Sequence, residues 1–389
     1  MNTIFESAER IAPIISGYVN EEENNRRLSP PVINALRETG LHRLYMPASL
    51  GGMETDPLTT AKMVEEIARH NTAAGWSMMV ANVSTWWCRW LPEKGIEEIY
   101  KKGRDTLIAG AFHPPMMATP VDGGYRINGK SPLASNVHEA SWIFVSAMVM
   151  ENGEVKMNNG MPQMIGVFMN SEHCQILDTW HTMGMKATDS NDVSADNVFV
   201  PAHLSFPLAP GNEPNKYYAG KLYRFAAVGI SVASLISPVA LAIARNAIQE
   251  LKVLAEKKTA FASVAPLRER GSIQKKLGMA EALVQSSRAY LHNTISDCWN
   301  KILGGDQLSM EDKAGLLLAA AHTNQSCVQA VDLMFSAAGS TGIYTRNKLA
   351  HYFSDIQVIR QHGFANDSRY ETVAQVYFGL PPDLPVLAF

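Results

Sequence analysis

The sequence predicts an α+β fold in which a small all-β domain separates two helical domains. The period of the apolar residues changes twice along the chain. Residues 1–110 and 216–389 follow helical periods, whereas residues 111–215 contain short alternating runs between turn residues. We therefore expect an N-terminal helical domain, a middle β-domain, and a C-terminal helical bundle that also serves oligomerisation.

Composition limits the classes of function. A chain of 389 residues should form two or three domains. Charged residues make up 18% of it, below the roughly 25% that is usual in soluble proteins, and 46% of it is hydrophobic. This balance predicts extensive buried surface, including subunit interfaces. The net charge of -3 is spread without basic clusters, so we expect no nucleic-acid partner.

Neither a metal site nor a membrane span is predicted. The four cysteines are far apart and lack metal-ligand spacing, which is typical of reduced packing residues. The N-terminus lacks a basic start before an apolar run, so we expect a cytoplasmic protein. Residues 225–244 are uncharged and long enough to cross a bilayer, but their Gly, Ser and Pro content favours a buried helix of the bundle.

The most specific stretch is residues 178–201, DTWHTMGMKATDSNDVSADNVFVP. By pattern it is a turn-rich connection followed by a strand. As a string it resembles the middle domain of the acyl-CoA dehydrogenase superfamily, and more closely its reduced-flavin-dependent, two-component monooxygenase branch, where W-x-x-x-G-M-(R/K)-x-T-x-S leads to (D/N)-V-F-V-P. The resemblance implies an N-terminal helical domain, a β-barrel-like middle domain and a C-terminal four-helix bundle.

The first candidate site is the run N-G-K-S-P-L-A-S-N at residues 128–136. In the resemblance, Ser135 falls on the Ser or Thr whose hydroxyl meets the flavin near N5, and Asn136 and Phe112 are further flavin contacts. An acceptor at the N5 proton would prolong the life of a C4a-hydroperoxyflavin. The alternative is that Ser135 is only a turn former.

His362 is the predicted catalytic imidazole. Acyl-CoA dehydrogenases carry a catalytic Glu in this window, at the position that Gly363 occupies, whereas the monooxygenase branch carries a His that His362 matches. An imidazole could donate a proton to the flavin hydroperoxide or accept one from the substrate. The alternative is a histidine that bonds carbonyls at a helix C-terminus.

The predicted substrate pocket departs from the family pattern. Several aromatic hydroxylases carry a His in a G-W-x-x-x-x-x-x-V-H-x-W helix, and Ser84 takes its place here, between Trp76 and Trp86. These two tryptophans and the neighbouring Trp87 suit a flat apolar wall, although aromatic residues at helical spacing are more often plain core. His113 could supply an imidazole in place of the missing one, but an exposed loop histidine is the favoured alternative.

Six further residues are predicted to contact the flavin phosphates or adenine across a subunit interface. By resemblance, the first three of these residues correspond to the R-x-x-F…Q contacts of the superfamily, and the other three correspond to its glycine-rich loop. A helix C-cap rich in glycine explains the second group without any ligand. These residues are Lys258, Phe261 and Gln274, followed by Gly339, Ser340 and Gly342.

The resemblance implies the oxygenase component of a two-component monooxygenase that uses reduced FMN or FAD and O2. It would hydroxylate a small electron-rich aromatic compound of phenol or indole type, and Ser84 favours an indole. The chain has no G-x-G-x-x-G after a strand, so we expect a separate NAD(P)H:flavin reductase, and a homotetramer built as a dimer of dimers. The alternatives are an acyl-CoA dehydrogenase or oxidase, an amine N-hydroxylase, and a flavin-binding scaffold without catalysis.

Overall fold

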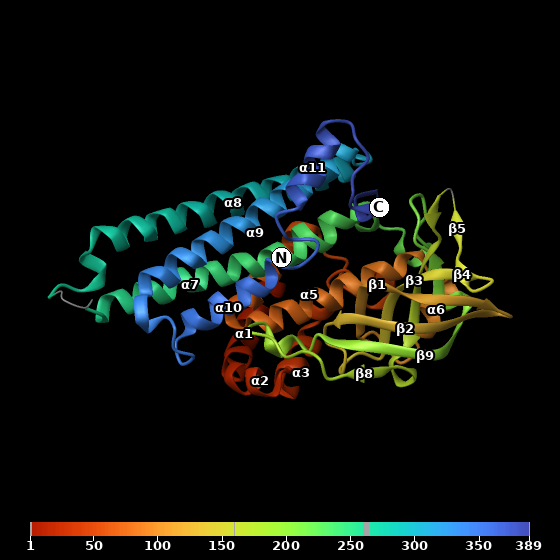
Figure 1. Ribbon diagram of the computed structural model, residues 1–389, viewed down its shortest axis with the longest axis horizontal. Helices are drawn as coiled ribbons and strands as arrows, with labels where there is room; N and C mark the ends of the chain where they lie inside the picture. The colour runs from red at the N-terminus through yellow and green to blue at the C-terminus, as the bar shows by residue number, and fades with distance from the viewer. Residues whose placement is uncertain (1, 159, 260–263, 389) are drawn as a thin grey trace.

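The computed structural model describes residues 2–158, 160–259 and 264–388. Short helices come first, a sheet follows, and long helices complete the chain. The sheet lies at one end of the molecule, and the long C-terminal helices extend away from it (Figure 1). The predicted α+β fold is therefore confirmed, whereas the domain limits at residues 110 and 215 stay predictions.

The N-terminal part is built from helices with polar caps. The Asp56 carboxylate accepts the Thr59 N–H at 2.9 Å before α4, and the Asn71 side chain accepts the Ala74 N–H at 3.1 Å before α5. Helix α5 is buried on nearly all sides and lies between the sheet and the C-terminal helices (Figure 1). The helices are α1 (Asn2–Gly17), α2 (Val19–Asn25), α3 (Pro30–Thr39), α4 (Pro57–His70), α5 (Thr72–Trp87) and α6 (Glu93–Ile99).

The central domain is one eight-stranded sheet with a short separate hairpin. Its hydrogen-bonded order is β10-β7-β3-β1-β2-β9-β8, with β4 paired to β3. Strands β1 and β3 are parallel, and the other pairs are antiparallel. The strands are β1 (Ile108–Val121), β2 (Gly124–Ala134), β3 (Trp142–Glu151), β4 (Glu154–Val155), β7 (Met164–Asn170), β8 (Gln175–Leu177), β9 (Asn191–Pro201) and β10 (Ser205–Pro207), and the hairpin is β5 (Met157–Asn158) with β6 (Met161–Pro162).

Two local features set the register of the sheet. Val121 pairs with Gly124, so β1 and β2 join through a two-residue turn in which Gly123 has a φ of 75°. On β9 the register shifts between Ala195 and Val198, where Asn197 has a φ of 53°. This bulge reverses the alternation of side chains, so that odd positions before it and even positions after it are both buried.

The C-terminal part consists of long helices packed around a buried one. The helical stretch Gly229–Lys257 is apolar enough to cross a bilayer, but 89% of its most apolar window is buried inside the protein. It begins with a π-helical segment, Gly229–Ile236, that contacts α4, α5 and α9. The helices are α7 (Ser237–Lys257), α8 (Gly271–Gly304), α9 (Met310–Ala338), α10 (Lys348–Ile359) and α11 (Arg369–Tyr377).

Candidate functional site

A cavity of about 420 Å³ lies where α5, the sheet, the π-helical segment and the chain after α10 meet. Its wall is mostly apolar, and the polar groups of its lining side chains are hydroxyls, indole N–H groups, two glutamine amides and one imidazole. No Asp, Glu, Lys or Arg of the described residues lines it. The lining residues are Trp76, Met79, Val80, Val83, Ser84, Trp87, Gly110, Phe112, Leu133, Ser135, Trp180, Thr182, Met183, Met185, Thr188, Ser190, Ser231, Ile236, Gln357, Val358, Ile359, Gln361, His362 and Phe364.

One face of α5 forms the first wall. Six of its residues line the cavity at positions i, i+3, i+4, i+7, i+8 and i+11, which is the repeat of a single helical face. Trp76 and Ser84 therefore lie where the sequence predicts the substrate pocket. Trp87, also expected in the apolar wall, shares this face, and its ring stacks on Phe144 with centroids 5.9 Å apart.

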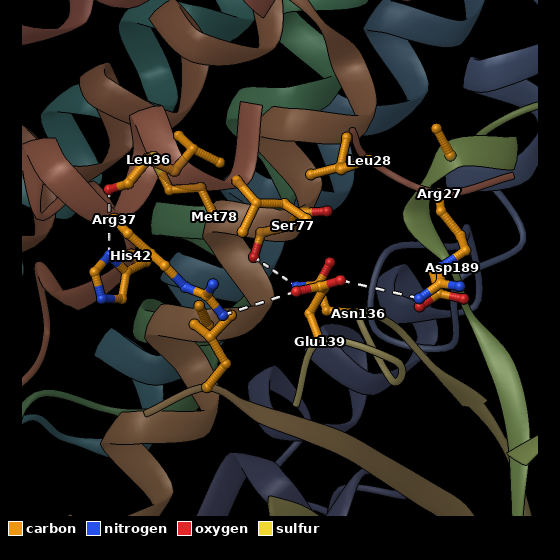
Figure 2. A pocket seen from close by; sticks show the side chains of 14 residues that line it. Arg27, Leu28, Leu36, Arg37, His42, Ser77, Met78, Asn136, Glu139 and Asp189 are labelled. Carbon is orange, nitrogen blue, oxygen red and sulfur yellow. Dashed lines mark hydrogen bonds and ion pairs between the residues drawn. The ribbon is translucent and has the colours of Figure 1, made fainter. Parts of the chain in front are cut away.

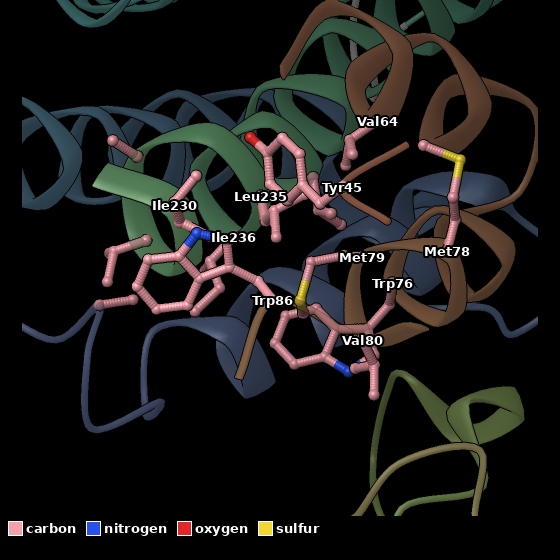
Figure 3. Close-up of a cluster of buried hydrophobic side chains, with 14 of the residues drawn as sticks. Tyr45, Val64, Trp76, Met78, Met79, Val80, Trp86, Ile230, Leu235 and Ile236 are labelled. Carbon is pink, nitrogen blue, oxygen red and sulfur yellow. The ribbon is translucent and has the colours of Figure 1, made fainter. Parts of the chain in front are cut away.

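The predictions for Trp86 and His113 need correction. Trp86 is ten positions beyond Trp76, so it points away from the cavity. It is fully buried, its indole lies beside Ile230 in the hydrophobic core (Figure 3), and the Arg89 guanidinium lies 3.1 Å from its ring centroid. His113 on β1 is exposed and does not line the cavity.

Ser135 reaches the cavity from the end of β2. Its Oγ accepts the Trp76 indole N–H at 3.1 Å and lies 2.7 Å from Ser190 Oγ. Leu133 and Asn136, which flank it, have φ values of 65° and 61°. A left-handed Leu is uncommon, and such strain is typical of functional sites. The cavity-facing hydroxyl thus sits in a segment that the surrounding structure holds in place.

Asn136 turns away from Ser135. Its amide donates to the Ser77 carbonyl at 2.9 Å and borders a second cavity of about 30 Å³, large enough for one or two waters (Figure 2). There Glu139 lies between Arg37 and Arg27, at 3.8 Å and 3.9 Å. The Asn136 side chain therefore ties the end of β2 to α5 and does not line the larger cavity, where the sequence predicted a flavin contact for it.

Phe112, the other flavin contact predicted near Ser135, does line the cavity. Its ring is 5.2 Å from that of Trp87 and 6.5 Å from that of Phe364, centroid to centroid. Aromatic side chains from α5, β1 and the chain after α10 therefore meet in one wall. Such rings bury much apolar surface and leave little room for water.

His362 faces the cavity as a neutral hydrogen-bond donor. Burial lowers the pKa of its imidazole to about 4. Nδ1 accepts the Phe364 backbone N–H at 3.2 Å, so the proton of the neutral ring lies on Nε2. Nε2 has no hydrogen-bond partner among the described residues, and the ring meets Trp76 edge-on with centroids 5.7 Å apart. Of the two predicted roles, this tautomer fits donation and not proton abstraction.

The predicted phosphate contacts lie elsewhere. The ends of α7 and α9 meet at the end of the molecule farthest from the sheet (Figure 1). There Lys258 donates to the Ala338 carbonyl at 2.6 Å, beside Gly339, and the Gln274 amide donates to the Arg268 carbonyl at 3.0 Å. Neither these residues nor Ser340 and Gly342 line the cavity of their own chain. Phe261 falls outside the described residues.

The loop between β8 and β9 supplies cavity residues that sequence reasoning did not assign. These residues belong to the stretch that carries the family resemblance, and that resemblance is the signal that could have found them. They are Trp180, Thr182, Met183, Met185, Thr188 and Ser190.

Asp355 of α10 anchors this loop. Its carboxylate accepts the Met185 N–H at 2.6 Å, and the Met185 carbonyl accepts from Trp180 Nε1 at 3.0 Å. Burial, helped by the nearby Glu23, raises the pKa of Asp355 to about 7, although the Met185 N–H and Lys186 oppose the rise. Ionisation of Asp355 therefore lowers the stability of the folded state.

Replacement of Asp355 by asparagine should remove a pH-dependent loss of stability. The pKa of the folded state lies above that of the unfolded state, so wild-type protein loses stability as pH rises from about 4 through 7. The amide oxygen of D355N still accepts the Met185 N–H but does not ionise. Urea unfolding at pH 5 and pH 8 should show a drop of a few kcal/mol in wild type and a smaller drop in D355N. Parallel changes in both would show that Asp355 does not ionise in this range.

Two models of one protein family match this chain. Residues 7–102 match the family model "Acyl-CoA dehydrogenase, N-terminal domain", and residues 234–367 match "Acyl-CoA dehydrogenase, C-terminal domain". Together the two matches span more than half of the chain. The chain belongs to the acyl-CoA dehydrogenase family.

Within this family the chain groups with the flavin-dependent monooxygenases. It is 29% identical to an indole-3-acetate monooxygenase of Pseudomonas putida, over 94% of this chain and 90% of the relative. It is 25% identical to the oxygenase subunit HsaA of a flavin-dependent monooxygenase of Rhodococcus jostii, over 96% and 97%. XiaF from a Streptomyces species, solved with FADH2 and glycerol, has the same fold, with a TM-score of 0.90 at 20% identity over 98% and 96% of the two chains.

Proposed function

We propose that this chain is the oxygenase component of a two-component monooxygenase that hydroxylates an uncharged, electron-rich aromatic compound of phenol or indole type. One observation carries the proposal. The Ser135 hydroxyl and the His362 imidazole open into the same cavity, which has aromatic walls and no charged side chain in its described lining.

The residues of the cavity fit a reduced flavin ring. Ser135 offers a hydroxyl oxygen to an N–H donor, and Phe112, Trp87 and Leu133 offer apolar surface to a flat ring. When bound, the reduced flavin would supply, with O2, an electrophilic oxygen for transfer to the substrate. The protein itself would exclude water, hold the ring through Ser135, and present the Nε2 proton of His362 to the reacting oxygen.

The lining favours substrates without charge. A carboxylate that enters such a cavity loses its hydration and finds no Lys or Arg among the described lining residues, which costs several kcal/mol. Ser84, where related hydroxylases carry His, offers only a hydroxyl to the substrate. A ring N–H, as in an indole, or a neutral phenol can bond to it without losing a proton to the enzyme.

The same lining argues against the dehydrogenase alternative. Removal of an α-proton from an acyl-CoA needs a base, and Gly363 has no side chain at the family's Glu position. No carboxylate of the described residues lines the cavity in its place. An amine N-hydroxylase would use the same oxygen chemistry and differ only in its product, and a scaffold would bind flavin without consuming oxygen.

The remaining parts of the proposal concern partners. A separate NAD(P)H:flavin reductase would supply the reduced FMN or FAD. We also propose a cytoplasmic homotetramer, a dimer of dimers, in which Lys258, Gln274 and the loop Gly339, Ser340 and Gly342 reach the phosphates of a flavin held by another chain. Their position at the far end of the C-terminal helices, away from their own cavity, supports this arrangement.

The test combines the purified chain, a flavin reductase, FMN or FAD, NADH and O2 with indole, phenol and indole-3-acetate. We expect oxygenated product from a neutral ring, with kcat/KM at least about 100-fold above that for the carboxylate, which corresponds to roughly 3 kcal/mol. Omission of the reductase is the control. Bleaching of oxidised flavin by an acyl-CoA would favour the dehydrogenase, and oxygen use that no substrate changes would favour the scaffold.

A further inference from the structure

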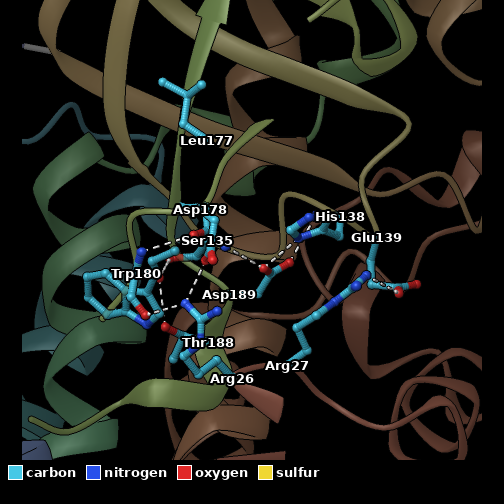
Figure 4. A network of polar contacts seen from close by, with 12 residues as sticks. Arg26, Arg27, Ser135, His138, Glu139, Leu177, Asp178, Trp180, Thr188 and Asp189 are labelled. Carbon is cyan, nitrogen blue, oxygen red and sulfur yellow. Dashed lines mark hydrogen bonds and ion pairs between the residues drawn. The ribbon is translucent and has the colours of Figure 1, made fainter. Parts of the chain in front are cut away.

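Three hydroxyl groups form a continuous chain beside the cavity. Ser135 Oγ lies 2.7 Å from Ser190 Oγ, which lies 2.7 Å from Thr188 Oγ1. The Trp76 indole N–H donates to Ser135 at one end, and the Met185 carbonyl accepts from Thr188 at 2.8 Å at the other. Ser135 and Thr188 approach each other from two separate loops (Figure 4).

The two ends of this chain fix the direction of every proton in it. A carbonyl only accepts, so the single Thr188 proton points at Met185, and Thr188 must accept from Ser190. The Ser190 proton is then used, so Ser190 must accept from Ser135. An indole N–H only donates, and Ser135 receives it at Oγ. Ser135 thus has no proton left for a ligand and one lone pair still free.

We propose that Thr188 and Ser190 are positioning residues that make Ser135 an acceptor-only group, and that the site thereby selects the redox state of the flavin. This inference rests on the proposed function. A reduced flavin carries a proton on N5 and is a donor there, whereas an oxidised flavin has only a lone pair at N5. A group that can only accept bonds the reduced ring and repels the lone pair of the oxidised one.

The backbone shows that this chain of hydroxyls is firmly held. Met185 and Asp189 have φ values of 53° and 52°, a conformation that is rare for residues other than glycine. The Asp189 carboxylate joins the two loops, since it accepts the His138 backbone N–H at 3.0 Å, contacts His138 Nδ1 at 2.7 Å and accepts the Asn191 amide at 2.9 Å (Figure 4). The Asn136 N–H donates to the Thr188 carbonyl at 3.0 Å.

Thr188→Val tests the inference without touching Ser135. Valine keeps the shape but cannot accept, so the Ser190 proton turns to Ser135 and the Ser135 proton turns to the cavity. The matched control is Thr182→Val, because Thr182 lines the same cavity and donates to the Gly184 carbonyl at 2.8 Å, outside the chain. Dissociation constants are measured anaerobically for reduced and oxidised FMN, and again for FAD.

We expect the preference for reduced over oxidised flavin to fall about 10-fold in T188V, the net value of about one hydrogen bond, and to stay within about 2-fold in T182V. If T188V does not fold, Ser190→Ala should lower the preference in the same direction, because it removes the acceptor of the Ser135 proton. Equal loss of both affinities, or no change in either, would overturn the inference. Wild-type protein that binds neither flavin in either redox state would instead overturn the proposed function, and this inference with it.

Discussion

Replacement of His362 by phenylalanine is expected to lower kcat/KM for hydroxylation by about two orders of magnitude, with the chain still folded. Phenylalanine fills the place of the imidazole beside Trp76 and Phe364 but offers no proton to the cavity. Burial holds the pKa of His362 at about 4, so the imidazole is neutral and donates from Nε2 throughout the physiological range. Loss of this donor should raise peroxide release at the expense of product.

His362→Gln is the matched control, because its amide nitrogen can take the place of Nε2. We expect H362Q to recover part of the rate and coupling that H362F loses. In wild type, a pH profile between about 5.5 and 8 should show no ionisation from His362. The folded-state pKa lies below the unfolded one, so the stability that the neutral ring contributes is lost as pH falls from about 6.5 to 4. Full coupling in H362F would remove His362 from catalysis.

Removal of the buried Glu65 carboxylate is expected to cost about 2–3 kcal/mol of stability. The Glu65 side chain is only 3% exposed, and it accepts Arg245 of α7 at 2.7 Å and Arg288 of α8 at 2.9 Å. It therefore ties α4 to both long helices. The side chains of the two arginines are about 40% exposed and can be hydrated again when Glu65 is removed. The loss of stability is therefore smaller than it would be if two buried charges were left unpaired.

Thermal unfolding of Glu65→Ala at fixed protein concentration should show a fall in Tm of about 2–4 °C. Glu281→Ala is the control, since Glu281 bonds Lys252 at 2.6 Å and joins the same α7 and α8 on the exposed surface. We expect E281A to change stability by less than about 1 kcal/mol. Equal effects of the two variants would mean that burial adds nothing to the Glu65 contacts.

Much of the fold was predictable because the period of the apolar residues changes where helices give way to strands. The bulge at Asn197 was not, although the buried positions Ala195 and Val198 have opposite parity in the sequence and so already required one. The alternation of apolar and polar residues does not by itself show where in the strand the side chains switch from one face of the sheet to the other.

The candidate site also contains residues that the sequence predicted and residues that it did not. Ser135, His362 and Ser84 meet in one cavity as expected, because each lies in a stretch that resembles the family. Trp86 was misplaced because α5 is buried on nearly all sides, so its apolar pattern does not reveal which face borders the cavity. The hydroxyl chain was missed because it joins residues 55 positions apart, and sequence spacing cannot give the distance between two loops.

The π-helical segment Gly229–Ile236 allows a change of one residue in the length of the chain to alter the cavity wall. Ser231 and Ile236 in this segment line the cavity, and the Ser234 hydroxyl bonds the Gly229 carbonyl five residues back. One residue turns a helix by about 100°. Deletion of a single codon here would tighten the segment to an ordinary α-helix and rotate Ser231 off the wall, while α7 keeps its place. A change in length of one residue could thus alter which compounds fit, in a lineage whose fold stays the same.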